Sequence, residues 1–315
     1  MPRRYLLLAN KRSGERMVRR AGREARLKRR FAYLAAAMLF FTTGSGGLNA
    51  QSTKDGIIPD PEDGAVADGV YMNPYFALSY RLPVGWAEGL EGPPPSNSGY
   101  YVLAALEGGG EGRPSLLIVA QDEFFAPASS ATLGDMARGV RDAEAEVPNV
   151  TIDREPATIT LAHRPFMRVD YSGGGLYRAW LATEIRCHAV IFNITATEPK
   201  AVADVVRNLD AMSLPGEAGV AGAPLCIKDY AEGGNVVRKV APSPTGPNFL
   251  KLPVRIIIDG DGHVTHVHVI HAFPEQRRAL EAALVQWQFK PYEVGGKAHA
   301  IETGIVFEFK PTGSR

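Results

Sequence analysis

A chain of 315 residues, 45% of them hydrophobic and 22% charged, can bury one or two hydrophobic cores of ordinary size. Its formal net charge of +1 conceals an asymmetry, because residues 1–30 contain 12 Lys or Arg and only two acids. Removing that segment from the totals of 35 basic and 34 acidic residues leaves 23 and 32, a net charge of −9. The basic N-terminal end is therefore a feature separate from the acidic remainder of the chain.

The basic segment continues directly into an uncharged apolar run, residues 31–44, and then into a short segment that has the small residue Ala50 before Gln51. This order is typical of a secretory signal peptide. The run is shorter than the roughly 20 residues of a spanning helix, but residues 31–48 could also form an uncleaved inner-membrane anchor. A nucleic-acid-binding tail would not explain the apolar run. We therefore expect residues 1–50, starting at Met1 or Met17, to export the remainder to the periplasm.

Residues 51–70 are polar, contain Gly and Pro and lack periodicity, so they predict a flexible linker. Residues 71–214 predict an α+β domain. Its strand patterns lie at residues 71–86, 100–106, 114–121, 166–172, 177–185 and 188–196. Two helical patterns, at residues 132–147 and 198–212, interrupt the strands.

Three phrases of this domain, FALSYRLPVGW, AHRPFMRVDYSGGGLYRAWLATEIRCHAVIFNITA and the closing helix followed by MSL, resemble the PsbP-like α/β/α sandwich of small exported proteins. The resemblance implies a binding or accessory role. The absence of catalytic signatures favours the same interpretation, because the chain contains neither a Gly-x-Ser-x-Gly motif nor a His-Glu-x-x-His motif. Its glycine-rich segments, residues 107–113 and 172–175, do not have the form of phosphate-binding loops. We therefore expect no enzyme activity and no cofactor.

The chain contains only two cysteines, Cys187 and Cys226. An oxidising compartment would allow the pair to form a disulfide. Nothing in their spacing requires a bridge, and we expect two isolated thiols.

A second linker is predicted over residues 215–235, and a second folded domain over residues 236–310. Residues 252–270 predict a β-hairpin around a DGDG turn. Pro274 then begins an amphipathic helix, which carries on one face Leu280, Ala283, Leu284 and Trp287. A last strand follows, in which one face carries Ile301, Ile305, Phe307 and Phe309.

The order β-β-α-β and the phrase AALVQWQFKP before a glycine turn resemble the C-terminal domain of the TonB family. The resemblance implies that the last strand is an accessible edge that captures an extended segment of an envelope or outer-membrane protein. The strand consists of Ile301, Glu302, Thr303, Gly304, Ile305, Val306, Phe307, Glu308 and Phe309. We expect Glu302 and Glu308 to point outward, and Ile305 and Phe307 to lie in the core. The family's Pro/Glu/Lys spacer and histidine-bearing membrane helix are missing, which argues against a full energy transducer.

Four histidines lie between positions 263 and 271. Strand alternation places His266 and His268 on one face, together with Val264 and Ile270. These two histidines could chelate a metal, but no acid or cysteine of the hairpin is an evident third ligand, and structural zinc normally needs four. We therefore predict a solvated strand face and no metal.

Together these features predict an exported, non-enzymatic TonB-like protein that binds envelope proteins through its C-terminal domain and could support transport across the outer membrane. The alternative is that the middle domain binds a small ligand or lipid, with the TonB-like domain as a docking module. Membrane contact is expected only through the N-terminal segment, and no nucleic acid is expected as a partner.

Overall fold

The computed structural model describes residues 58–89, 92–126, 132–216, 219–220, 222–243 and 251–308. The signal or anchor segment predicted over residues 1–50 and the strand residue Phe309 lie outside these ranges. Residues from Ser52 to Arg315 form one compact unit. Within the described ranges, no helix is long and apolar enough to cross a membrane.

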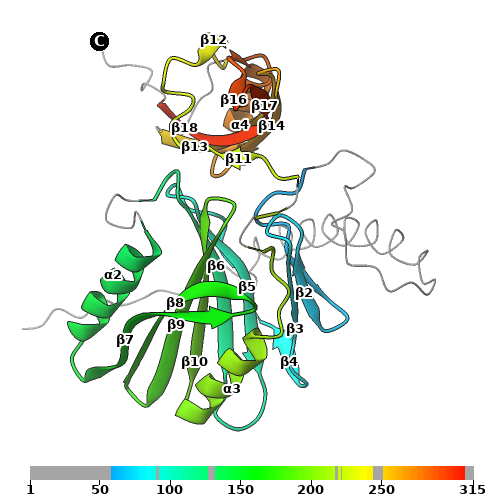
Figure 1. Cartoon of the computed structure of the whole chain (residues 1–315). Coiled ribbons are helices and arrows are strands. Elements are labelled where there is room, and N and C mark those ends of the chain that lie inside the picture. The colour runs from blue at the N-terminus through cyan, green and yellow to red at the C-terminus, as the bar shows by residue number, and fades with distance from the viewer. Residues whose placement is uncertain are drawn as a thin grey trace, which may run out of the picture. The chain divides into compact units, whose positions relative to one another are not determined.

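The middle region is built on a seven-stranded antiparallel sheet with the order β4-β5-β6-β10-β9-β8-β7 (Figure 1). Its strands are β4 (Trp86–Glu88), β5 (Tyr100–Gly108), β6 (Ser115–Asp122), β7 (Val150–Leu161), β8 (Arg164–Gly173), β9 (Leu176–Ile185) and β10 (His188–Ala196). The sequence did not predict β7. Most of its side chains are exposed or half-buried, so it shows no apolar alternation.

Two helices cover opposite faces of this sheet. Helix α2 (Leu133–Ala145) packs on β7, β8 and β9, and α3 (Pro199–Leu209) packs on β9 and β10. Neighbouring residues of β10 point to opposite faces, so Val190 joins the core beneath α3 and Ala189 joins the core beneath α2. The predicted α+β class is confirmed.

A three-stranded sheet of β1 (Ala65–Ala67), β2 (Val70–Asn73) and β3 (Leu78–Arg81) precedes the large sheet. Residues 58–70 are therefore structured, although the sequence predicted a flexible linker over residues 51–70. They are fixed by contacts that local composition does not show: the Asn73 side-chain amide, for example, donates to the Pro61 carbonyl at 2.8 Å.

The C-terminal region contains a four-stranded sheet with the order β11-β18-β13-β14. The strands are β11 (Leu225–Cys226), β13 (Lys251–Ile258), β14 (Val264–Val269) and β18 (Ile301–Glu308), and α4 (Pro274–Leu284) packs on β14. Two small pairs complete it: β12 (Val236–Arg238) with β15 (Gln288–Phe289), and β16 (Tyr292–Val294) with β17 (Lys297–His299). The predicted hairpin, helix and last strand are present, while β11 lies in the predicted second linker.

A bulge in the β13–β14 hairpin changes which residues share a face. Ile257 pairs with His266 and Ile258 pairs with Val264, so Thr265 is an extra residue in β14. The extra residue sends Val264 into the same core as Val269. The prediction that Val264 shares a face with the two histidines is therefore wrong, because simple alternation does not allow for a bulge.

Candidate functional site

The last strand is covered on its second side at its beginning. β18 pairs with β13 on one side and, at Ile301 and Glu302, with the parallel strand β11 on the other. The main-chain N–H of Ile227 donates to the Glu302 carbonyl at 3.0 Å. Within the part of the chain that the structure describes, no further strand pairs with this side. The predicted accessible edge therefore shortens to residues 303–308.

Ladder geometry decides which main-chain groups of this edge are available. Because the Glu302 carbonyl points toward β11, alternation directs the main-chain groups of Gly304, Val306 and Glu308 to the same side. Gly304 packs closely on the middle region, since an added Cβ would lie 2.7 Å from the Phe124 Cβ. Val306 and Glu308, farther along the same side, are exposed, and Val306 is 47% exposed, so we take these two as the open positions.

A groove of about 460 Å³ lies beside the open end of β18. Its lining residues are Lys239, Val240, Ala241, Pro242, Trp287, Ile305, Val306, Phe307 and Glu308. The Trp287 indole N–H donates to the Val240 carbonyl at 2.7 Å, and its ring lies 5.7 Å from the Phe307 ring, centroid to centroid. Ile305 and Phe307 are half-buried and contact the core from this groove, so neither is a fully buried core residue.

Glu302 was predicted to point outward, but it is 3% exposed. Its Oε1 accepts hydrogen bonds from Arg255 Nε at 3.1 Å and from the Tyr75 hydroxyl at 3.0 Å, and its Oε2 pairs with Arg186 Nη2 at 3.1 Å. Arg255 Nη1 also pairs with Asp122 Oδ2 at 2.7 Å. Strand alternation predicts which residues of β18 share a face with Glu302, but it does not predict what covers that face. In the structure, the middle region covers it at Glu302. The prediction of an outward Glu302 is wrong.

This buried charge cluster, Asp122, Arg186, Arg255 and Glu302, joins the middle and C-terminal regions. Burial raises the pKa of Asp122, and the Arg255 guanidinium offsets only part of that effect. Burial acts in the same direction on Glu302, but Arg255 and Arg186 outweigh it and hold its pKa below the ordinary value. His188 lies beside the cluster, and burial together with the Arg255 charge holds its pKa well below the ordinary range. We interpret the cluster as two cations balanced by two carboxyl groups, which serves to join the regions.

Cys187, in the turn between β9 and β10, forms a disulfide with Cys226 of β11, with their Cα atoms 6.0 Å apart. The prediction of two isolated thiols is therefore wrong. The cysteines are separated by 39 residues, and only the folding of the chain brings them together. The bridge fixes β11 to the middle region at the place where β11 covers the start of β18.

The histidine face of β14 is covered rather than solvated, because His268 is 3% exposed and His266 is 23% exposed. Asp60 Oδ1 lies 3.0 Å from His266 Nε2 and 3.0 Å from His268 Nδ1. Glu62 Oε2 lies 3.4 Å from His268 Nε2, and the Tyr101 ring is stacked on His268 with centroids 6.2 Å apart. The prediction of a solvated face is therefore wrong. It failed because Asp60 and Glu62, which cover the histidines, belong to the segment that the sequence predicted to be a flexible linker.

Charge complementarity explains how these groups are accommodated. Burial by itself lowers the pKa of His268, but the hydrogen bond with Asp60 and the charges of Glu62 and Asp60 outweigh it, so the pKa is raised. Burial raises the pKa of Asp60 in turn, yet its two histidine partners hold it well below the ordinary value. Burial raises the pKa of Glu62. This histidine–acid cluster, Asp60, Glu62, His266 and His268, is thus a site that favours positive charge.

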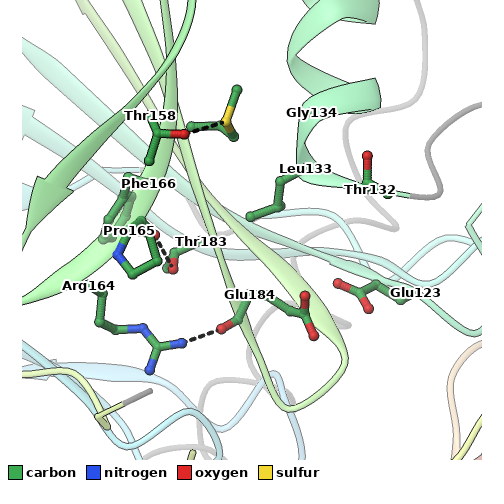
Figure 2. A pocket seen from close by; sticks show the side chains of 11 residues that line it. Glu123, Thr132, Leu133, Gly134, Thr158, Arg164, Pro165, Phe166, Thr183 and Glu184 are labelled. Carbon is green, nitrogen blue, oxygen red and sulfur yellow. Dashed lines mark hydrogen bonds between the residues drawn. The ribbon is translucent and has the colours of Figure 1, made fainter. Parts of the chain in front are cut away.

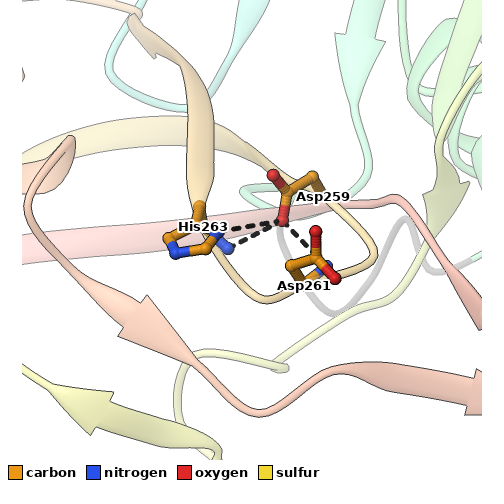
Figure 3. A group of neighbouring side chains, drawn as sticks. All are labelled: Asp259, Asp261 and His263. Carbon is orange, nitrogen blue, oxygen red and sulfur yellow. Dashed lines mark hydrogen bonds and ion pairs between the residues drawn. The ribbon is translucent and has the colours of Figure 1, made fainter.

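Figure 3 shows another group of potential ligands, Asp259, Asp261 and His263, in the turn between β13 and β14. Asp259 Oδ1 accepts hydrogen bonds from the main-chain N–H groups of Asp261 at 3.0 Å and His263 at 2.8 Å. The side chains of Asp261 and His263 are exposed. The geometry is that of an Asp-stabilised hairpin turn, which accounts for these residues.

A hollow of about 400 Å³ lies in the middle region beside the N-terminus of α2 (Figure 2). It is lined by Glu123, Thr132, Leu133, Gly134, Thr158, Arg164, Pro165, Phe166, Met167, Thr183 and Glu184. The Arg164 guanidinium donates to the Glu184 carbonyl at 2.6 Å. Burial, together with the charges of Glu184 and Asp122, raises the pKa of Glu123 to about 7.

The raised pKa of Glu123 makes stability depend on pH. The folded protein binds this proton more tightly than the unfolded chain, so the stabilisation is present below the ordinary pKa of 4.5 and is lost as pH rises through about 7. Glu123→Gln removes the ionisation, and we expect it to raise the melting temperature at pH 8 while changing it little at pH 5. Thermal unfolding followed by circular dichroism at both pH values checks this. An equal shift at the two pH values would show that Glu123 does not titrate in this range.

Comparisons with known proteins do not assign the chain to a family. No protein-family model matches it, and no curated protein matches it. Cyanobacterial PsbP (CyanoP) from Synechocystis sp. PCC 6803 is a weakly similar solved structure: 13% identity, 56% of this chain and 99% of that chain covered, TM-score 0.35. LpqN, involved in cell envelope biogenesis of Mycobacterium tuberculosis, gives 9% identity, 44% and 84% coverage and a TM-score of 0.32. Similarity this weak carries no functional argument.

Proposed function

We propose that the chain is an exported, non-catalytic binding protein that captures an extended segment of an envelope protein on the open end of β18. The observation that carries this proposal is that the end of β18, which no other described strand covers on its second side, lies beside a largely apolar groove at Trp287 and Phe307. Added strands gain affinity from main-chain hydrogen bonds and specificity from pockets that receive alternate side chains. Val306 and Glu308 would supply the hydrogen bonds, and the groove would receive the side chains.

Two sequence features support this assignment of partner and compartment. The basic segment and apolar run within residues 1–50 support export, and the β-β-α-β order with AALVQWQFKP supports a TonB-like domain. The groove is lined mainly by apolar side chains, and each of its two charged lining residues has a partner: Lys239 Nζ lies 4.9 Å from the Trp287 ring centroid, and Glu308 pairs with Lys251 at 2.9 Å. We therefore infer a partner segment with apolar side chains facing the groove. More specifically, we propose that binding of this segment supports transport across the outer membrane.

Photo-crosslinking in cells that produce the full chain tests the capture site. A photoreactive amino acid at Val306 is expected to form an adduct with an envelope protein, and mass spectrometry should map the adduct to a short extended segment. Val285, at the end of α4, is the matched control because it is also an exposed valine, 54% exposed compared with 47% for Val306. The same adducts in equal yield at both positions, or none at Val306, would contradict the proposal.

Val306→Pro separates main-chain pairing from side-chain contact. Proline has no N–H to donate, and an edge strand tolerates it where that N–H has no partner within the sheet. We expect the captured complex to weaken about three- to tenfold, because one main-chain hydrogen bond contributes roughly 0.5–1.5 kcal/mol. The yield is measured with the crosslinker moved to Glu308, and Val306→Ala serves as the control that keeps the amide. Equal yields from the two variants would exclude pairing at Val306.

The hollow beside α2 favours a second function, which is binding of a small amphiphilic molecule by the middle region. Leu133, Phe166 and Met167 provide apolar walls, and Glu123 and Glu184 place acids at its margin (Figure 2). In this alternative the C-terminal region is a docking module. Native mass spectrometry of the purified chain tests it: a copurifying molecule that is lost in Thr158→Trp, which fills the hollow, would favour this function.

A further inference from the structure

Strand β11 closes the first part of the β18 edge with few contacts of its own. It contains only two residues, Leu225 and Cys226, and β18 is its one sheet neighbour among the described strands. The Leu225 N–H donates to the Ala300 carbonyl at 2.9 Å, and ladder geometry directs the Glu302 N–H back toward β11. Leu225 is 40% exposed, so its side chain adds little burial. Ile227, directly after the strand, packs against the C-terminal core.

The disulfide joins β11 to a turn that is itself firmly held. Arg186 and Cys187 form the two-residue turn between β9 and β10, and their φ values are 51° and 54°. Residues other than glycine adopt this left-handed conformation only where their surroundings impose it. Arg186 is fixed by its ion pair with Glu302 at 3.1 Å, and Cys187 is fixed by the bridge to Cys226. While the bridge is intact, β11 therefore cannot leave the start of β18.

We propose that the Cys187–Cys226 bridge is a redox switch that sets the length of the capture edge. Reduction by a dithiol releases β11 and makes the main-chain N–H of Glu302 available to the captured segment. In the oxidised chain the segment pairs with residues 303–308, and in the reduced chain it pairs with residues 302–308. This inference rests on the proposed function, because it concerns regulation of the same edge.

The reduction is a thiol–disulfide exchange in which the dithiol supplies two electrons. One thiolate of the dithiol attacks a sulfur of the bridge, the Sγ–Sγ bond breaks, and the other cysteine leaves as a thiolate that takes up a proton. The second thiolate of the dithiol then closes its own disulfide, which releases and protonates the remaining cysteine. Cys187 and Cys226 are half-buried, so neither lies enclosed in a core. They are the only cysteines of the chain, so reduction acts on this bond alone.

Residue-level hydrogen exchange of the full chain, with and without dithiothreitol as the dithiol, tests the release of β11 without any partner. We expect the amides of Leu225 and Glu302 to exchange about tenfold faster in the reduced chain, because their main-chain hydrogen bonds to one another's strands open. The amides of Ile305 and Phe307, which face β13, should keep their protection. Far-ultraviolet circular dichroism confirms that the reduced chain is folded.

The effect on capture is measured with a synthetic peptide that has the sequence of the segment crosslinked at Val306. In the reduced chain the peptide should restore protection at Glu302 and bind about three- to tenfold more tightly, which is the contribution of roughly one main-chain hydrogen bond. The double variant Cys187→Ser, Cys226→Ser is the control, because it should give the reduced result with and without dithiothreitol. A peptide that binds neither form would contradict the proposed function itself, and this inference with it.

Three results would overturn the switch while leaving the proposed function standing. The first is equal peptide affinity and equal protection at Glu302 in the two redox forms. The second is loss of protection at Ile305 and Phe307 together with Glu302, because the bridge would then be a structural link only. The third comes from trapping thiols with a maleimide in cells that produce the chain: we expect both redox forms, and recovery of the oxidised form alone would show that the bridge is not a switch.

Discussion

Arg255→Met is expected to lower the free energy of unfolding by about 3–5 kcal/mol, because removing one partner leaves the other buried charges without compensation. Arg255 is 2% exposed and is the shared cation between Asp122, at 2.7 Å, and Glu302, at 3.1 Å. Methionine fills a similar volume, so the loss reports charge rather than a cavity. Urea unfolding at equilibrium measures the change.

Arg154→Met provides the control for that measurement. Arg154 also pairs with a carboxylate, Asp170, at 3.2 Å, but its side chain is 47% exposed. Exposed pairs contribute little, so we expect less than about 1 kcal/mol at this position. If Arg255→Met and Arg154→Met cost the same, the buried charge cluster does not hold the two regions together.

Replacing Cys187 and Cys226 together by serine is expected to have the next largest effect, about 3–4 kcal/mol of unfolding free energy, because the bridge closes a loop of 39 residues in the unfolded chain. β11 should also detach more readily from the start of β18, since its fixed point in the middle region is lost. Urea unfolding of the oxidised chain, the reduced chain and the double-serine variant measures both contributions. Two free thiols in the oxidised chain, or unchanged stability on reduction, would contradict the disulfide.

Local sequence pattern predicted the regular elements well where apolar side chains are buried. The prediction of a strand over residues 188–196 coincides with β10. Leu280, Ala283 and Leu284 of the predicted helical face are buried in α4, whereas Trp287 is buried beyond the end of that helix. β7 was missed because few of its side chains are buried. The bulge at Thr265 was missed because an extra residue leaves no mark on hydrophobic alternation.

The contacts between regions could not be predicted in the same way, because they join residues far apart in sequence. Glu302 and Arg186 meet across 116 positions, and Asp60 and His266 across 206. One signal was available: Arg255 interrupts an otherwise apolar strand, which suggests a charge that must find a buried partner. The partners Asp122 and Glu302 had no comparable signal. The acids of residues 58–64 were likewise hidden within a segment whose composition resembles a linker.

The most direct measurement of the central claim is residue-level hydrogen exchange of β18 in the full chain. In the free protein, the amides of Val306 and Glu308 should exchange quickly, whereas those of Ile305 and Phe307, which ladder alternation directs toward β13, should exchange slowly. Adding a synthetic peptide with the sequence of the segment crosslinked at Val306 should slow exchange at Val306 and Glu308. An amide at Val306 that is already as protected as that of Ile305, or that stays unprotected when the peptide binds, would contradict capture by strand addition.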